Sequence, residues 1–487
     1  MPATIANITN VLRTSILSGR SLFMLHRCIR SSFIVAIVAA AVTVATGAVA
    51  QSIRSTPSTR DMSAQQWRAQ QLAAADRSDS IMKDAEKQQG LLAQYGHMQL
   101  AYDANHDRAF QLIFGQYLSW FLTYVGNYDG ARDAFSIAQP TQSDDGPSPL
   151  GGAGWQLKPA ADVILDMAKD RKAVFFNEAH SAPITRTLTI QLLAKLREQG
   201  FDYFAAETLY EADKDLNTRG YPNAQTGFYT NEPLYAEMVR TALKLGYKVV
   251  AYDAENAGVG DPREKAGAQN LIDRVFKKDP NARLVVNAGF AHVQKSGKYL
   301  GGTSMGEFFH KLSGIDPLTI EQTMMIQHAR TDQDHPYYLS ITQMKQFREP
   351  SVFVSGKKAW TLKPDQYDMS VIFPPQERSD ERPDWLRVGG LRVAYGVGSE
   401  VCNTHFPCMV EARYADEGPD SIPADRAILN VIDPNAPAQN RFVSFHGTAT
   451  TRLFLRPGKY RLSSMDRQGH SLFGRDVTIA GEGMAQK

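Results

Sequence analysis

Polar side chains able to transfer protons follow four successive apolar runs in the middle of the chain. The runs are "KAVFFNEAH", "FDYFAAET", "KVVAYDAE" and "ARLVVNAGFAH". Their polar ends are Glu178 and His180, Glu207, Asp253 and Glu255, and His292. An imidazole paired with a carboxylate can take up or donate a proton near neutral pH. These residue types therefore predict acid–base chemistry, provided that the fold brings the four ends together.

The periodicity around these residues predicts a parallel α/β sheet, which would bring the four strand ends together. Helix-length stretches such as "TRTLTIQLLAKLREQG" and "EPLYAEMVRTALKLG" separate the short apolar runs. Strands and helices in alternation form a three-layer domain, with helices on both faces of a parallel sheet. Two helices end at Gly200 and Gly246, where a left-handed cap belongs. Because ligands bind at the carboxyl ends of such strands, the acids and imidazoles are expected to share one crevice.

Each of these residues also has a purely structural interpretation. A single acid after a strand commonly caps the next helix or pairs with an arginine, and a lone histidine is more often a hydrogen-bonded structural residue. The joint pattern favours a functional site, because clustered carboxylates raise one another's pKa and a fold gains nothing from that effect unless the site uses it.

Two regions of different periodicity flank the α/β pattern, which we place at residues 156–345. Residues 62–138 carry apolar positions three and four apart and predict a helical unit. A Pro-, Gly- and Ser-rich linker at 139–155 follows it. Residues 350–480 contain short strand patterns separated by turns, which predict a small antiparallel β-sandwich as an accessory domain.

The first fifty residues predict export. Residues 1–50 contain arginines but no Asp or Glu, and an apolar run from Phe33 ends in Ala48-Val49-Ala50. This order is typical of a cleaved signal peptide. An uncleaved anchor is the alternative, because the apolar run approaches membrane-spanning length. Cleavage would leave a periplasmic or secreted protein that is not in the membrane and begins with a disordered linker at 51–61.

The net charge limits the expected binding partners, and the cysteine content predicts a disulfide. The formal net charge of +2 becomes slightly negative once the arginines of residues 1–50 are removed. Without a basic stripe, nucleic acid is not the expected partner, and a small molecule is. Cys402 and Cys408 are the two cysteines that follow the signal segment, and we expect them to form a disulfide in an oxidising compartment. A metal site including His405 would lack a fourth ligand.

The motifs described above resemble the superfamily that joins erythromycin esterases to ChaN-type haem-uptake lipoproteins. The resemblance covers about residues 172–314, and its shared features occur here in the same order. They are Glu178 and His180, Glu207, Arg263 with Glu264, and Gly289 with His292. This chain has Asn177 where the family usually has glycine, and its Glu-x-His spacing is shorter than that of the macrolide esterases. Macrolides are therefore not the expected substrate.

The resemblance implies an esterase-like hydrolase in which a histidine activates water. On that basis His180 is the expected general base, and Glu178 or Glu207 would orient its ring. His292 would polarise the carbonyl oxygen or protonate the leaving alkoxide. The expected catalytic set is Glu178, His180, Glu207, His292 and Arg263. A serine nucleophile is disfavoured, because Ser181 directly follows His180 and no G-x-S-x-G motif occurs.

Further side chains near the same edge are expected to contact the substrate. Arg186 or Arg263 would stabilise the developing oxyanion. The full expected substrate-binding set is Arg186, Asp253, Glu255, Tyr210 and Tyr229. The loop between Glu211 and Pro233 would act as a lid and set specificity.

No cofactor is expected for this reaction, and two alternatives remain open. In the first, a divalent metal ion would be held with an open position for water. Its ligands would come from His180, His292, Glu178, Glu207 and Asp253. In the second, a haem or iron carrier of the ChaN type would use an exposed tyrosine or histidine. The candidate tyrosines are Tyr210, Tyr221, Tyr229 and Tyr252.

Overall fold

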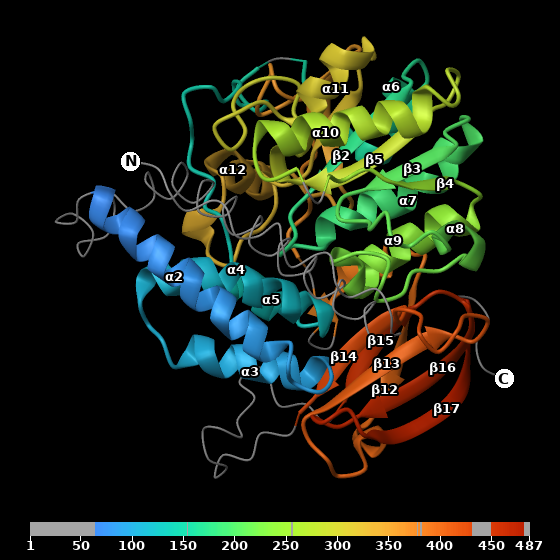
Figure 1. The fold of residues 1–487 in the computed structure, drawn as a ribbon. Helices are drawn as coiled ribbons and strands as arrows, with labels where there is room; N and C mark the ends of the chain where they lie inside the picture. Colours follow the sequence, from blue (N-terminus) through green and yellow to red (C-terminus); the bar gives the residue numbers. More distant parts are fainter. Residues whose placement is uncertain are drawn as a thin grey trace, which may run out of the picture.

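The computed structural model contains three packed units, coloured along the chain in Figure 1. It describes residues 64–152, 154–254, 257–376, 378–379, 382–430 and 450–481. The expected signal peptide at 1–50, the segment at 51–61 and Glu255 lie outside the described residues. Within the described part of the chain, no helix combines the length and the apolar character needed to cross a bilayer.

The N-terminal unit consists of helices, as the sequence predicts. Its elements are α2 (Ala64–Ala85), α3 (Leu91–Asp103), α4 (Arg108–Tyr124) and the short α5 (Tyr128–Ala134). Asp107 caps α4 by accepting the backbone N–H of Phe110 at 2.9 Å. Most of α4 is buried, because it packs between α2, α3 and α5 on one side and the α/β unit on the other. The apolar residues of α4 therefore form the core of this unit.

The central unit is built on a six-stranded parallel sheet, which confirms the predicted α/β class. The strand order is β4-β3-β5-β2-β6-β9. In chain order, the strands are β2 (Ala173–Glu178), β3 (Tyr203–Ala206), β4 (Lys248–Ala251), β5 (Leu284–Gly289), β6 (Leu318–Glu321) and β9 (Met369–Ser370). Every residue of β2 and β5 is buried. Burial on both faces explains why these strands read as continuous apolar runs.

Helices cover both faces of this sheet and make three layers (Figure 1). One face, with Phe176 and Phe204, packs against α7 (Ile184–Glu198) and α9 (Pro233–Lys244). The opposite face packs against the second pair of helices, α10 (Asp261–Leu271) and α11 (Met305–Ser313). The remaining helices are α6 (Ala160–Ala168), α8 (Leu216–Arg219) and α12 (Pro336–Met344). The predicted caps at Gly200 and Gly246 are left-handed, with φ of +93° and +77°.

Two segments that were expected in the β-sandwich belong to the α/β unit, so its predicted end at residue 345 is too early. The segment "YDMSVIFP" contains β9, which pairs with β6 at the edge of the parallel sheet. The segment "SVFVSG" contains β7 (Ser351–Ser355), which pairs with β1 (Gln156–Pro159) and β8 (Lys358–Ala359). An apolar pattern identifies a strand but not its partner, and that is the reason for the error.

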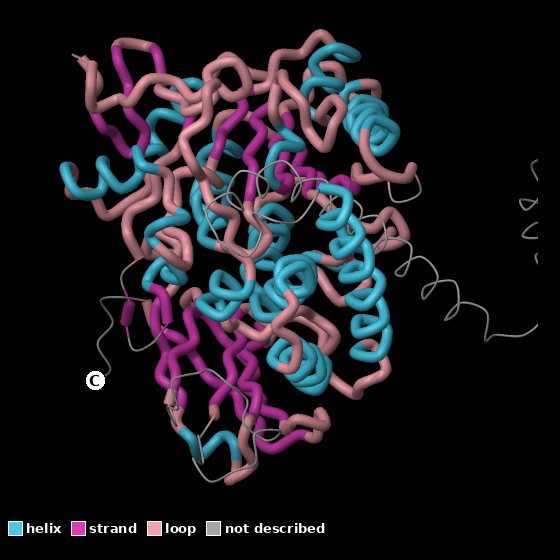
Figure 2. Tube along the Cα trace, turned by 90° about the vertical axis from the view of Figure 1, so that its left-hand side faces the viewer, coloured by secondary structure: helices cyan, strands magenta, loops and turns pink. Residues whose placement is uncertain are grey.

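The C-terminal unit consists of two antiparallel sheets around a shared core, as predicted (Figure 2). The sheets have the orders β14-β13-β16-β17 and β12-β15. Their strands are β12 (Val393–Val397), β13 (Cys408–Tyr414), β14 (Asp425–Leu429), β15 (Thr451–Leu455), β16 (Gly458–Met465) and β17 (Ser471–Ile479). A two-residue ribbon, β10 (Arg378–Ser379) with β11 (Arg382–Pro383), precedes them. Cys402 and Cys408 form the predicted disulfide.

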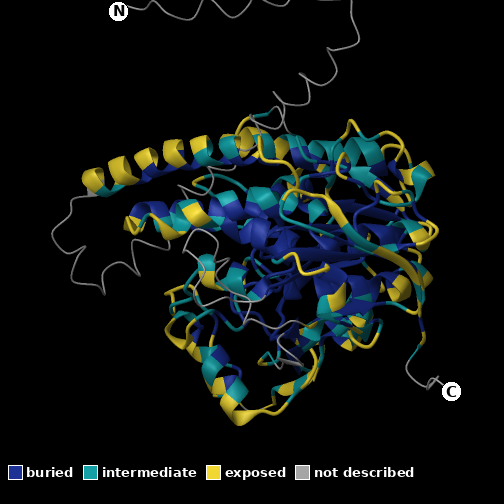
Figure 3. Cartoon of the chain, turned by 90° about the horizontal axis from the view of Figure 1, so that it is seen from below, coloured by how far each residue is buried: buried dark blue, intermediate teal, exposed yellow. Residues whose placement is uncertain are grey.

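The C-terminal unit is joined to the α/β unit by ion pairs whose carboxylates are buried. Arg240 on α9 contacts Glu417 at 2.6 Å, and Glu237 on the same helix contacts Arg456 at 2.6 Å. Figure 3 shows that buried residues continue through the interior of the molecule, while exposed residues lie on its outer surfaces. The two units therefore share an interior, and the C-terminal unit is part of the structural support of the central one.

Candidate active site

The turn after β2 holds the first half of the predicted site. Glu178 is the last residue of β2, and its Oε1 lies 2.9 Å from Nδ1 of His180. Because a carboxylate only accepts hydrogen bonds, Nδ1 carries a proton and the lone pair of the neutral ring is on Nε2. Tyr229 stacks on the imidazole with ring centroids 3.9 Å apart. His180 is thus held in the tautomer and orientation of a general base.

Glu178 is kept ionised by the groups around it. Arg186 donates from Nε and Nη2 to the two oxygens of Glu178, at 2.9 and 2.8 Å. Asn287 on β5 donates a further bond of 2.7 Å. Burial alone would raise the pKa of the Glu178 carboxyl, but Arg186 and then His180 outweigh it and lower the pKa to about 2. The negative charge beside Nδ1 of His180 is therefore permanent at neutral pH.

Arg186 does not have the role expected from the sequence. Its third donor group, Nη1, binds Glu232 at 2.7 Å, so all three guanidinium nitrogens contact carboxylates. The side chain is 1% exposed. The expectation that it contacts the substrate or an oxyanion is wrong, because its donors are already used. It instead holds Glu178 against His180.

The second half of the site centres on Glu207, directly after β3. Its Oε1 accepts a bond from Arg263 at 3.0 Å and lies 3.3 Å from Nε2 of His292. Its Oε2 accepts the backbone N–H of Gly289 at 2.5 Å and lies 3.7 Å from Nε2 of His180. Burial opposes ionisation of Glu207, but His292, His180 and Arg263 outweigh it and lower its pKa well below the usual value. One carboxylate thus lies between the two histidines.

His292, like His180, has a glutamate close to each of its ring nitrogens. Its Nδ1 lies 2.7 Å from Glu264, and its Nε2 faces Glu207. Burial alone would lower the pKa of His292, but Glu264 and Glu207 outweigh it and raise the pKa to about 10. Both ring nitrogens therefore carry protons at neutral pH. His292 can therefore act as a proton donor, which is the acid half of acid–base catalysis.

The raised pKa of His292 predicts how stability changes at alkaline pH. A group whose pKa rises from 6.5 to about 10 on folding stabilises the protein fully below 6.5. That contribution is lost as pH rises through about 10. We expect the free energy of unfolding, measured in urea, to decrease between pH 7 and 10. His292→Gln, which cannot titrate, should show a smaller decrease. Equal slopes for the two proteins would contradict this assignment.

The backbone around the site is tightly constrained. A Cβ added at Gly289 would lie 2.3 Å from Nε2 of His180 and 2.8 Å from Oε2 of Glu207. Thr208 and Phe290, the residues that follow Glu207 and Gly289, have φ of +59° and +44°. Side-chain-bearing residues rarely adopt this region, and such strain clusters at functional sites. Glycine is therefore needed at 289 for the close approach of the His180 and Glu207 side chains.

Gly289→Ala should remove activity without unfolding the protein. The new methyl group would occupy the position of the His180 imidazole, so the ring must move away from Glu207. We expect kcat to fall by about a hundredfold, because small misplacements of a catalytic group have effects of this size. The control is Gly474→Ala on β17, where an added Cβ meets no atom within 4 Å. Activity within about twofold of wild type in Gly289→Ala would show that the crowded geometry is not the active one.

The other predicted site residues have different outcomes. Asp253 binds Arg263 with two contacts, at 3.0 and 2.7 Å, and so positions the guanidinium instead of facing a substrate. Tyr210 is half-buried, donates its backbone N–H to Thr226 and lies outside the contacts described above. Glu255 lies outside the described residues. Arg263 lies beside Glu207 and His292, with 13% of its side chain exposed, and its catalytic role stays a prediction.

The loop expected to act as a lid is tied to the C-terminal unit. Tyr221 donates its hydroxyl to Asp420 at 3.1 Å, and Asn223 donates to the same carboxylate at 2.7 Å. Tyr229 and Tyr252 are buried, at 3% and 4% exposure. The tyrosines proposed for a flat ligand therefore have different surroundings. The loop reaches the site through Tyr229, which stacks on His180, and through Glu232, which binds Arg186.

Two buried partners of the site were missed in the sequence. Glu232 caps α9 by accepting the N–H groups of Leu234 and Tyr235, and it also binds Arg186. The Glu-Pro pair that opens α9 is a helix-start signal and could have identified it. Asn287 lies in the middle of the apolar run "LVVNAG", and a polar residue there needs a buried partner. That partner is Glu178.

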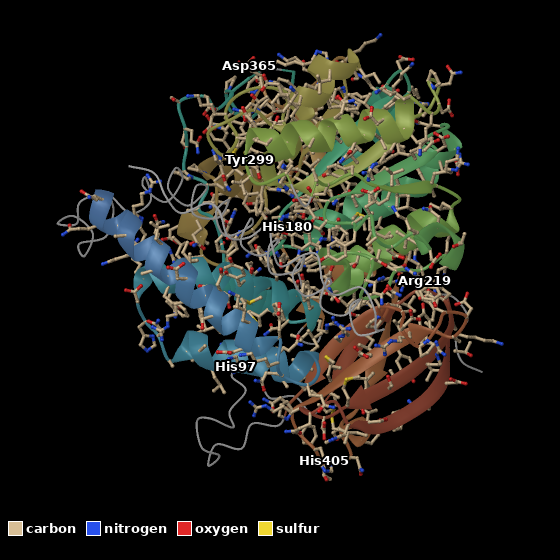
Figure 4. All side chains as sticks on the ribbon, viewed as in Figure 1. His97, His180, Arg219, Tyr299, Asp365 and His405 are labelled. Atoms are coloured by element: carbon tan, nitrogen blue, oxygen red, sulfur yellow. A yellow bond between two sulfur atoms is a disulfide. The ribbon has the colours of Figure 1, made fainter. Side chains whose placement is uncertain are left out.

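The described part of the chain contains no cluster of side chains arranged as metal ligands. No group of three or more His, Cys, Asp or Glu side chains among residues 64–152, 154–254 and the later described ranges has the arrangement of metal ligands. Glu178 and Asp253, two of the expected ligands, are engaged by arginines. Figure 4 places His180 deep between the helical and α/β units, and His405 at the far tip of the C-terminal unit.

Comparisons with known proteins give only distant similarity. No family model and no curated protein matches the chain. The structure of the type III effector HopBA1 is similar at 14% identity and a TM-score of 0.25, covering 38% of this chain and 96% of that chain. RRSP, a MARTX toxin effector domain from Vibrio vulnificus CMCP6, is similar at 16% identity and a TM-score of 0.21, covering 47% and 40%. A structure titled "Bacterial protein toxins" has 17% identity and a TM-score of 0.25, covering 46% of each chain. The chain thus spans less than half of the last two, and similarity at this level carries no conclusion about function.

Proposed function

We propose that this protein is an exported hydrolase that cleaves carboxylic esters with an activated water molecule. The observation that carries the proposal is the position of Glu207, 3.7 Å from Nε2 of His180 and 3.3 Å from Nε2 of His292. It joins an imidazole that can accept a proton to an imidazolium that can donate one. Ester hydrolysis requires both functions in one small volume.

His180 would begin the reaction as the general base. Its Nε2 takes a proton from water, and the resulting hydroxide attacks the ester carbonyl. Glu178, ionised and 2.9 Å from Nδ1, stabilises the imidazolium that forms. Because water is the nucleophile, no covalent acyl-enzyme is formed. This reaction uses the tautomer that the Glu178 contact imposes.

His292 and Arg263 would complete the hydrolysis. The Nε2 of His292 and the Nη1 of Arg263 lie 3.4 Å apart, so both can donate to the same oxyanion. As the tetrahedral intermediate collapses, the carbon–oxygen bond to the leaving group breaks and His292 gives its proton to the alkoxide. His180 is then protonated and His292 neutral. Glu207, which contacts both rings, is placed to return the proton from the first to the second.

The motifs that resemble the erythromycin esterase and ChaN superfamily support the same assignment, since the side chains that match it are the ones that meet here. A haem carrier and a metal-dependent hydrolase are the alternatives from the same residues. Export by the signal segment belongs to this proposal as well.

The test is hydrolysis of 4-nitrophenyl acetate by the chain without its first fifty residues, in the presence of EDTA. We expect turnover in chelator and no initial burst of nitrophenol, because no acyl-enzyme accumulates. Activity lost in EDTA and restored by a divalent ion would favour the metal-dependent alternative. A Soret band on addition of haemin, without ester cleavage, would favour the haem carrier.

A further inference from the structure

A small hollow lies beside His180, over the carboxyl ends of the neighbouring strands β2, β5 and β6. Its volume is about 40 Å³. Ala179 and Ser181, the chain neighbours of His180, form part of its wall. Phe290 forms another part, and its ring lies edge-on to the His180 imidazole with centroids 5.2 Å apart. The hollow is thus one aromatic ring away from the proposed base.

The helical unit closes the other side of this hollow. Phe135 and Ile137, in the segment after α5, line it together with Ile326 from the segment after β6. Most of these groups are hydrocarbon, so the hollow favours an apolar stem. The volume of about 40 Å³ is close to three times the roughly 10–15 Å³ that one water molecule needs. The hollow could therefore hold a side group of about three to five heavy atoms.

Two polar groups in the wall have unused hydrogen-bonding capacity. His328 lines the hollow, is 6% exposed, and is fixed by Asp334, whose Oδ1 lies 3.0 Å from its Nδ1 and 2.6 Å from its backbone nitrogen. Nδ1 therefore carries the proton, and within the described ranges no partner is recorded for Nε2. Arg132 also lines the hollow; its Nη groups bind Gln376 and Asp129, while its buried Nε has no partner among the described residues.

We propose that this hollow is a specificity pocket for the acyl part of the substrate, and that it selects a short group bearing a hydroxyl. The hydroxyl can donate its proton to Nε2 of His328, whereas the Nε of Arg132 is too buried for a ligand in the hollow to reach. A plain alkyl group would leave the Nε2 of His328 unpaired. Asp334 is a positioning residue, because it sets the tautomer of His328. The pocket as a substrate site rests on the proposed hydrolase.

The kinetic test compares two esters that differ by one hydroxyl. Wild type should cleave 4-nitrophenyl 3-hydroxybutyrate with a kcat/KM about tenfold above that for 4-nitrophenyl butyrate, which is the scale of one net hydrogen bond. His328→Leu should lose this preference. Dividing the ratio for wild type by the ratio for the variant removes the intrinsic reactivity of the esters. The control is His310→Leu, at an exposed histidine of α11, and it should keep the wild-type ratio.

A binding measurement separates failure of the pocket from failure of the hydrolase. In the wild-type chain with isotope-labelled histidines, sodium 3-hydroxybutyrate should shift the NMR signal of His328, and sodium butyrate at the same concentration should not. The signal is assigned by its loss in His328→Gln, which also serves if the leucine variant does not fold. If neither ester is cleaved but the shift occurs, the hydrolase fails and the ligand pocket stands. Equal responses to the two acids, or an ester ratio unchanged in His328→Leu, would overturn the pocket.

Discussion

His180→Ala should lower kcat for neutral esters by about a thousandfold while leaving the fold intact. The variant removes the proton acceptor, and general bases contribute about 10²–10⁴ to rate. Its neighbours Glu178 and Glu207 remain paired with Arg186 and Arg263, so no buried carboxylate is left without a cation. The measurement is kcat for 4-nitrophenyl acetate in EDTA, with urea unfolding as the check on stability.

The matched control for this variant is His405→Ala. His405 is an exposed histidine in the turn that the disulfide closes, far from the site (Figure 4). It should keep the wild-type kcat. If His180→Ala retained more than a tenth of the activity, His180 would not be the base.

Arg186→Met should lower the free energy of unfolding by about 3–5 kcal/mol, the scale for removing one partner of a buried ion pair. Glu178 and Glu232 would lose their common cation at side-chain exposures of 1% and 0%. Loss of Arg186 also removes the main attraction that lowers the pKa of Glu178, so that pKa should rise. Urea unfolding at pH 7 measures the stability change.

Two comparisons make the Arg186 result specific. Arg330→Met removes an ion pair with Asp332 whose side chains are 68% and 70% exposed, and it should change the free energy of unfolding by less than about 1 kcal/mol. Adding Glu178→Gln to Arg186→Met should recover part of the loss, because one uncompensated charge disappears. Additive effects of the two substitutions would mean that their contact is not energetically coupled.

The helical unit takes part in the same network. Tyr128, at the start of α5, donates its hydroxyl to Glu232 at 3.0 Å. Glu232 binds Arg186, which binds Glu178, which orients His180. Trp120 on α4 also packs edge-on against Tyr229, the residue that stacks on His180. A unit that looks like a separate accessory in the sequence therefore supports the proposed base directly.

The sequence by itself determined the sheet and the edge at which the site lies. The runs that end in Glu178, Glu207 and His292 are apolar because β2, β3 and β5 are buried on both faces, and burial of that kind is visible in composition alone. Parallel strands must deliver their carboxyl ends to one edge, so convergence of the two histidines followed from topology. The disulfide between Cys402 and Cys408 was also predictable, because these are the two cysteines that follow the signal segment.

Only the tertiary structure decided which groups face a substrate and which hold others in place. Arg186 and Arg263 look alike in the sequence, yet the first is fully engaged by Glu178 and Glu232 while the second keeps an Nη1 beside His292. The pairing of β9 with β6 and the position of His328 in the hollow also depend on segments far apart in the chain. Local periodicity reports whether a side chain is buried. It does not report the partner of that side chain, because hydrogen-bond partners are set by contacts across the fold.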